Sequence, residues 1–289
     1  MKNLYRISYV VLLLFIFFSC TKQAEDVIKI ADLTPWCIVN FDSLERSPSD
    51  RIAMLKEMGF TKYGYNWDVK HLDQMKEEFA LASENNMEIV SIFLWLNAKR
   101  DSIGKLSPSN QRMLNIISEV KNKPTIWLSF SNNYFEDRTH EESISLAVEF
   151  IKFIKSKTDK MGSKIALYNH RGWFGNPHHQ IEIIELLPQD SLKMVYNFHH
   201  AHHYLDEFSD LAKKMKPYLS YVTINGMRQD GPEILTIGEG DYEQKMIQLL
   251  IDEGFNGPWG ILGHIKTEDV HKVLERNVNG LKSLEFNRN

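Results

Sequence analysis

The chain has 289 residues, of which 43% are hydrophobic and 25% are charged, which is the composition of a globular protein and not of a disordered or collagen-like one. Its net charge of -4 gives no general reason to bind nucleic acid, whose phosphates require a basic face. Two cysteines cannot form a disulfide scaffold, whereas eleven histidines are an excess whose positions matter.

The N-terminal segment 1–19 has the pattern of an export signal. Lys2 and Arg6 precede an apolar run over residues 10–18, which is too short for a membrane-spanning helix of about 20 residues. A positive start, a short apolar stretch and a small residue at the cut are typical of a secretory signal. The residues Phe17-Phe18-Ser19-Cys20 resemble a bacterial lipoprotein lipobox, with Phe17 at the position of the usual leucine.

This resemblance implies cleavage before Cys20 and lipidation of its thiol; an ordinary signal peptide with a chance cysteine is the alternative. We therefore expect a protein of the bacterial cell envelope, periplasmic or outer-membrane associated, that meets the membrane through its lipid anchor only. Residues 20–34 are expected to form the tether and residues 35–286 the folded domain. Cys37 lies in an apolar run and is predicted to be a small core residue, not a nucleophile.

From residue 36 onward, short apolar runs alternate with longer amphipathic stretches. The apolar runs predict strands over 36–41, 62–66, 88–95, 125–129, 164–169, 193–197, 218–224 and 258–262. The amphipathic stretches predict helices after each strand, among them 49–58, 69–85, 141–160, 204–216, 242–253 and 267–284.

Eight strands that alternate with helices predict a parallel sheet, and this chain length suits a single (β/α)8 TIM barrel of the α/β class. The alternative is a doubly wound open sheet. It is disfavoured because no glycine-rich phosphate loop follows an early strand.

The active site of such a barrel lies where the strands end and the βα loops begin. Six of the eleven histidines fall at three of these ends, beside asparagines and tryptophans. Aromatic faces next to uncharged polar groups suit a sugar, because rings cover C–H faces while amides and imidazoles match hydroxyls. For any single asparagine, capping of strand and loop backbone is the alternative. The predicted substrate-binding residues are Asn66, Trp67, Asp68, Trp95, Asn169, Trp173, Asn197, Asn225, Arg228 and His264.

Several segments, in order and spacing, carry a family resemblance. They are the strand end 165–174, the stretch 197–200, the glycine-containing stretch 235–241 and the joint 254–262. Across residues 35–284 the sequence resembles the xylose-isomerase-like TIM barrels, the sugar phosphate isomerase/epimerase superfamily. The resemblance implies a barrel that acts on carbohydrates or polyols. It also implies one divalent metal, held by Glu, Asp, His and Glu at the ends of strands five to eight.

This sequence departs from the family at the implied metal ligands. Tyr168 stands at the strand-five Glu position, Asn197 at the strand-six Asp position, and Leu262 or Gly263 at the strand-eight Glu position. A hard cation such as magnesium requires carboxylate oxygens that these positions lack. A softer ion could use imidazoles, so any cofactor stays unknown. The weak candidate ligands are His170, His199, His200, His202 and His264.

His170 and His200 are the predicted catalytic residues, because imidazole titrates near neutrality and both keep positions of the family motifs. The leading hypothesis is an exported sugar isomerase or epimerase, or a related keto-sugar lyase, that removes a proton next to a carbonyl. Its partner would be a small carbohydrate. One alternative is a carbohydrate-binding lipoprotein without catalysis. Another is a glycoside hydrolase, which needs two facing carboxylates.

Overall fold

The computed structural model describes residues 21–23 and 28–287, so the predicted signal segment and Cys20 lie outside the described residues. The barrel strands are β2 (Thr34–Trp36), β3 (Lys62–Tyr65), β4 (Glu88–Leu96), β5 (Thr125–Phe130), β6 (Ile165–Tyr168), β7 (Lys193–Asn197), β8 (Leu219–Ile224) and β9 (Trp259–Leu262). The helices that follow them are α2 (Pro48–Glu57), α3 (Leu72–Glu84), α4 (Pro108–Glu119), α5 (His140–Met161), α6 (Pro177–Glu185), α7 (Phe208–Met215), α8 (Glu243–Asp252) and α9 (Val270–Ser283).

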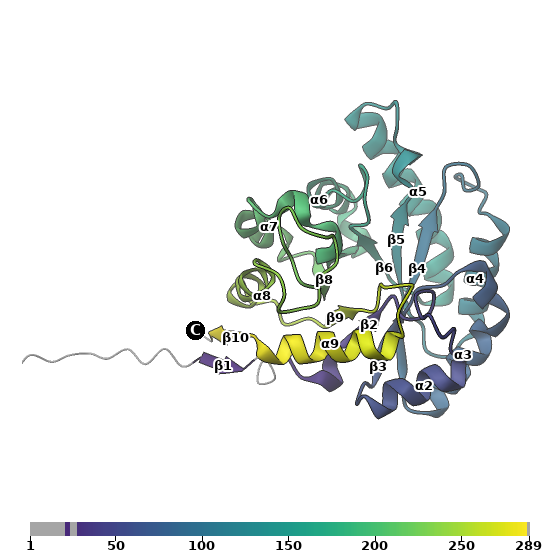
Figure 1. Ribbon diagram of the computed structural model, residues 1–289. Helices are drawn as coiled ribbons and strands as arrows, with labels where there is room; N and C mark the ends of the chain where they lie inside the picture. The colour runs from purple at the N-terminus through teal and green to yellow at the C-terminus, as the bar shows by residue number, and fades with distance from the viewer. Residues whose placement is uncertain (1–20, 24–27, 288–289) are drawn as a thin grey trace, which may run out of the picture.

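The eight strands are parallel and run in the order β2-β9-β8-β7-β6-β5-β4-β3. The two end strands of this order, β2 and β3, contact each other, so the sheet curls into a nearly closed barrel with the helices around it (Figure 1). The predicted single (β/α)8 barrel is confirmed. In the part of the chain that is described, no helix is both long and apolar enough to cross a membrane.

The first and the last of the described strands pair outside the barrel. β1 (Thr21–Gln23) pairs in antiparallel fashion with β10 (Glu285–Asn287), directly after α9, and the two strands lie side by side in Figure 1. Within the segment predicted to be a tether, Ile28 and Leu33 are buried, and a 3-10 helix, η1 (Ile30–Asp32), lies between them.

Helix starts follow local capping chemistry. The side chain of Ser47 accepts a hydrogen bond from the backbone N–H of Asp50, and Pro48 opens α2. Thr139 and Glu142 form a reciprocal capping box at the start of α5, which ends at Gly162 in the left-handed conformation. These contacts satisfy backbone groups that a helix end leaves unpaired.

The first strand was predicted too far along the chain. It spans Thr34–Trp36 and not 36–41, because Cys37 has a φ of 59°, which no extended strand can accommodate. The chain therefore turns directly after Trp36, and Asn40 and Phe41 stand on a loop. The helix predicted over 204–216 likewise begins later, at Phe208, because two short 3-10 helices precede it: η5 (Phe198–His200) and η6 (His202–Tyr204).

Aromatic side chains fill the lumen of the barrel. The rings of Trp36 and Trp127 have centroids 4.5 Å apart, and Trp127 stacks on Tyr168 at 5.6 Å with an interplanar angle of 12°. Tyr221 meets the edge of Trp127 at 5.0 Å. Such packing makes the lumen a core and not a pore, so a ligand has access only above this layer.

Candidate functional site

A cavity of about 570 Å³ lies at the carboxyl ends of β2, β3, β4, β6, β7 and β9. It brings together many of the residues predicted at strand ends. Those that line it are Asn66, Trp67, Asp68, Trp95, His170, Asn197, His199, His200 and His264.

Four histidines from three strand ends meet in this cavity. His170 follows β6, His199 and His200 lie in η5 after β7, and His264 follows β9. The ring centroids of His170 and His200 are 4.6 Å apart, and those of His199 and His264 are 5.0 Å apart. The rings of His199 and His200 lie 4.2 Å apart and join the two pairs.

These imidazoles are neutral at pH 7. Burial lowers the pKa of His170 to about 4 and that of His264 to about 3, with a smaller contribution from His199. Burial also lowers the pKa of His200 far below its usual value, and it lowers that of His199. Nδ1 of His170, His200 and His264 has no hydrogen-bond partner among the described residues. These three Nδ1 atoms are themselves buried, while the rings that carry them line the cavity.

The floor of the cavity is a hydrogen-bonded triad. Trp36 Nε1 donates to the phenolic oxygen of Tyr168 at 3.2 Å, and the side-chain amide of Asn197 donates to the same oxygen. Burial raises the pKa of Tyr168 well above its usual value, so the phenol keeps its proton. Tyr168 and Asn197, where the family resemblance implies carboxylates, are thus bonded to each other as neutral groups.

Aromatic residues form part of the cavity wall. Trp67 donates from Nε1 to the backbone oxygen of Phe93 at 2.7 Å, which fixes the indole ring. The Phe93 ring lies 5.8 Å from the His170 ring, and the Trp95 ring lies 6.3 Å from it. Trp95 is 39% exposed, a large exposure for tryptophan, and stands where a sugar face could cover it.

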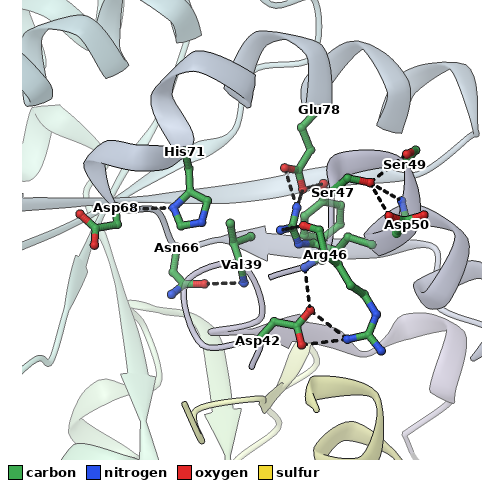
Figure 2. A network of polar contacts seen from close by, with 12 residues as sticks. Val39, Asp42, Arg46, Ser47, Ser49, Asp50, Asn66, Asp68, His71 and Glu78 are labelled. Atoms are coloured by element: carbon green, nitrogen blue, oxygen red, sulfur yellow. Dashed lines mark hydrogen bonds and ion pairs between the residues drawn. The ribbon is translucent and has the colours of Figure 1, made fainter. Parts of the chain in front are cut away.

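Polar side chains near β2 and β3 mainly form hydrogen bonds with the backbone. Figure 2 shows Asn66 accepting a hydrogen bond from the Val39 N–H, at 3.2 Å, and Asp68 beside His71, whose Nδ1 accepts from the Asp68 N–H. The Asp68 carboxylate caps η2 (Val69–His71) through the Val69 N–H and is exposed at the rim.

Asp42, another carboxylate near a strand end, does not line the cavity. Its two oxygens face the Arg46 guanidinium at 2.8 and 2.9 Å, as Figure 2 shows. Arg46 also bonds Asp269 at 2.7 Å, so this network joins the first βα loop to the last one.

Five of the predicted residues lie outside the cavity. Asn169 is fully buried and bonds the backbone N–H and oxygen of Asn197, while Asn225 bonds the backbone oxygen of Gly226. Trp173 packs on the His179 ring at 4.5 Å, and Arg228 pairs with Asp241 at 2.9 Å on the surface. His202 lines a neighbouring cavity of about 330 Å³, which shares Arg171, His199 and His200 with the first.

Several lining residues escaped the sequence reasoning. Trp36 and Phe93 are lumen-facing members of their strands, and alternation along a barrel strand is the signal that could have assigned them. Arg100, on the loop after β4, and Ser109 and Asn110, in the first turn of α4, had no comparable signal.

The residues present do not fit the metal site that the family resemblance implies. The phenol of Tyr168 stays protonated, Asn197 is an amide whose nitrogen is turned to that phenol, and Leu262 has no ligating atom. Over residues 21–23 and 28–287, no group of three His, Cys, Asp or Glu side chains is arranged to hold a metal ion. The imidazoles pack ring against ring and share no common centre.

A family model described as xylose isomerase-like TIM barrel matches residues 52–284. The chain belongs to this family.

Solved structures with the xylose isomerase-like fold align with most of the chain. The 3-keto-D-glucoside 4-epimerase YcjR from E. coli has a TM-score of 0.64 at 16% identity and covers 87% of this chain and 99% of its own. The probable 3-DHS dehydratase AsbF from Bacillus anthracis has a TM-score of 0.63 at 13% identity, with 89% and 100% covered. D-psicose 3-epimerase from Clostridium cellulolyticum H10, solved with D-tagatose, has a TM-score of 0.55 at 13% identity, with 86% and 94% covered. A search of curated protein sequences gives no match.

Proposed function

We propose that this protein is a sugar isomerase or epimerase, or a related keto-sugar lyase, that removes a proton from the carbon next to a carbonyl. The observation that carries the proposal is the pair of neutral imidazoles, His170 and His200, which line one cavity with ring centroids 4.6 Å apart. Their Nδ1 atoms are buried and have no hydrogen-bond partner among the described residues. Two such groups can take up a proton and return it to a neighbouring carbon or to the other face of the same carbon.

The basicity of His170 suits this step. A ring nitrogen with a pKa of about 4 is about as basic as an ordinary glutamate, whose pKa is about 4.3. It is unprotonated throughout the neutral range, so it is ready to act as a base without a preceding loss of a proton. The similarity in fold to a keto-glucoside epimerase, a psicose epimerase and a probable dehydratase supports the same class of chemistry.

The substrate we propose is a small unphosphorylated carbohydrate. The aromatic wall of Trp67, Phe93 and Trp95 can cover the C–H face of a sugar ring, while Asn66 and Arg100 in the cavity lining can meet hydroxyls. The test is incubation in D2O with a sugar panel of D-fructose, D-tagatose, D-psicose and methyl 3-keto-D-glucoside, followed by mass spectrometry. Deuterium gain by at least one sugar supports the enzyme.

The second candidate is a carbohydrate-binding protein without catalysis. It is favoured by the scarcity of carboxylates: among the described lining residues Asp68 is the one carboxylate, and it caps a helix at the rim. The same observation speaks against a glycoside hydrolase built on two facing carboxylates. Sugar binding by calorimetry, without deuterium gain on the whole panel, would favour the binding role.

We also propose that the protein is exported and held to the cell envelope through a lipid on Cys20. The lipobox-like residues Phe17-Phe18-Ser19-Cys20 support this proposal. An unphosphorylated substrate agrees with that location.

A further inference from the structure

The phenolic oxygen of Tyr168 has both of its acceptor positions in use. Trp36 Nε1, which can only donate, points to it at 3.2 Å, and the Asn197 side chain makes the second contact. The orientation of the Asn197 amide follows from its other end, because Oδ1 accepts the His199 backbone N–H at 3.1 Å. The group turned to Tyr168 is therefore the NH2 donor.

A hydroxyl that accepts two hydrogen bonds must direct its own proton elsewhere. Among the described residues no oxygen or nitrogen accepts it, and the nearby Cys37 thiol offers only a weak sulfur acceptor. Tyr168 lines the cavity, and its ring centroid lies 5.4 Å from that of Phe93 and 5.9 Å from that of His200. The cavity is thus provided with a fixed O–H donor at its floor.

We infer that Tyr168 is a catalytic residue whose O–H donates a hydrogen bond to the carbonyl oxygen of the substrate, in place of the divalent metal that the family resemblance implies. The inference deepens the proposed function and rests on it for the chemistry. Trp36 and Asn197 are positioning residues, since they hold the phenol with its proton directed at the ligand.

The step balances without a metal. A histidine base takes a proton from the carbon next to the carbonyl, and the C–H electron pair forms a C=C bond. The carbonyl π electrons move onto oxygen, where the Tyr168 O–H stabilises the enolate charge. Return of the proton to carbon restores the carbonyl, so Tyr168 keeps its own proton throughout and no oxidant or reductant is consumed.

The test compares wild type with Tyr168→Phe, which removes the O–H and keeps the ring. Tyr134→Phe is the matched control, because Tyr134 is a buried tyrosine that donates to the Asp101 backbone oxygen at 2.7 Å and does not line the cavity. Loss of one such donor lowers kcat by about 10²–10³-fold in acyl-transfer enzymes. We expect a fall of that size in deuterium exchange for Tyr168→Phe, a KM within a few-fold of wild type, and no change for Tyr134→Phe.

A second readout does not depend on turnover. The infrared C=O stretch of bound methyl 3-keto-D-glucoside should lie at lower wavenumber in wild type than in Tyr168→Phe, because a hydrogen bond weakens the carbonyl bond. If Tyr168→Phe fails to fold, incorporation of 3-fluorotyrosine in place of Tyr168 keeps the shape and makes the O–H a stronger donor. The C=O stretch should then move lower still.

The outcomes separate the two proposals. A Tyr168-dependent C=O shift without any deuterium exchange would support Tyr168 as the hydrogen-bond donor and would overturn the proposal that the protein is an enzyme. Deuterium exchange by Tyr168→Phe with a wild-type kcat and an unchanged C=O stretch would support the proposed enzyme and would overturn the role of Tyr168 as donor. Exchange that EDTA abolishes and magnesium or manganese restores would also overturn the donor, as a metal would then polarise the carbonyl. Failure of all four panel sugars to bind wild type would overturn both.

Discussion

The imidazole rings of His170 and His200 lie with their centroids 4.6 Å apart at an angle of 60°, although one follows β6 and the other follows β7. The adjacency of these two strands in the barrel order brings the rings together. Both rings are sheltered and neutral, and each has an unpaired Nδ1. The pair is therefore the natural place to look for proton transfer.

Replacement of either histidine should reduce exchange. We expect His170→Ala and His200→Ala each to lower the rate of deuterium exchange by about 10²–10⁴-fold, the usual contribution of a general acid or base. His140→Ala is the matched control, since His140 pairs with Glu182 at an exposed site away from the cavity. Wild-type rates in both cavity variants would remove these residues from the mechanism.

The pH profile of exchange should lack the usual histidine inflection. With the pKa of His170 lowered to about 4, the base is unprotonated above about pH 5, so kcat/KM should be flat from there to pH 8. Below pH 5 it should fall as the ring takes up a proton. A profile that falls with a midpoint near 6.5 would show that the base has an unperturbed pKa instead.

The same groups make stability depend on pH. The pKa values of His170 and His264 are about 4 and about 3 in the folded chain, against about 6.5 in the unfolded one. As pH falls below 6.5, the unfolded chain takes up protons that the folded chain refuses, so stability is complete above 6.5 and is lost towards pH 3. Denaturant titrations of wild type and of a His170→Asn, His264→Asn double variant should show a flatter pH dependence in the variant. An equal pH dependence of the unfolding free energy in wild type and variant would contradict the lowered pKa values of His170 and His264.

The largest effect of a single ion pair on stability is expected inside the first βα units. Arg51 Nη1 and the Glu78 carboxylate lie 2.7 Å apart with exposures of 2% and 1%, and Tyr63 also donates to Glu78. Glu78→Gln leaves the guanidinium buried without its counter-charge, which should lower the free energy of unfolding by about 3–5 kcal/mol. The control Asp73→Asn breaks an exposed pair with Arg112 and should lower it by at most about 1 kcal/mol. Similar decreases in the free energy of unfolding of Glu78→Gln and Asp73→Asn would indicate that the Arg51–Glu78 pair is accessible to water.

Lipidation can be tested on the mature chain. Expressed in a bacterial host, the full-length protein should partition with membranes and carry an acylated Cys20 at its N-terminus by mass spectrometry. Cys20→Ser should abolish acylation and leave the chain in the soluble fraction or uncleaved in the membrane. A mature wild-type chain that begins at another residue would rule out the anchor.

Hydrophobic periodicity was sufficient to predict the barrel, because its strands and helices alternate with clear apolar runs and amphipathic stretches. It failed at β2, where an apolar run continues past Trp36 but a left-handed Cys37 ends the strand. A backbone angle at one residue is set by packing and has no mark in the sequence pattern.

The candidate site was predictable in part for a similar reason. A strand-end position assigns a residue to the upper rim, but it does not say whether an amide serves the ligand or the backbone. Asn197 lines the cavity, whereas the side-chain amide of Asn169 makes its hydrogen bonds to the backbone of Asn197. Trp36 was missed because it faces the lumen from within a strand, a direction that depends on the register of the closed barrel.

The most direct measurement of the central claim is the mass of each panel sugar after incubation in D2O with chelator-treated protein. The account predicts that at least one sugar gains a deuterium with wild type and that the gain is lost in a His170→Ala, His200→Ala double variant. A gain that persists in the double variant, or no gain on any sugar with folded wild type, would contradict it.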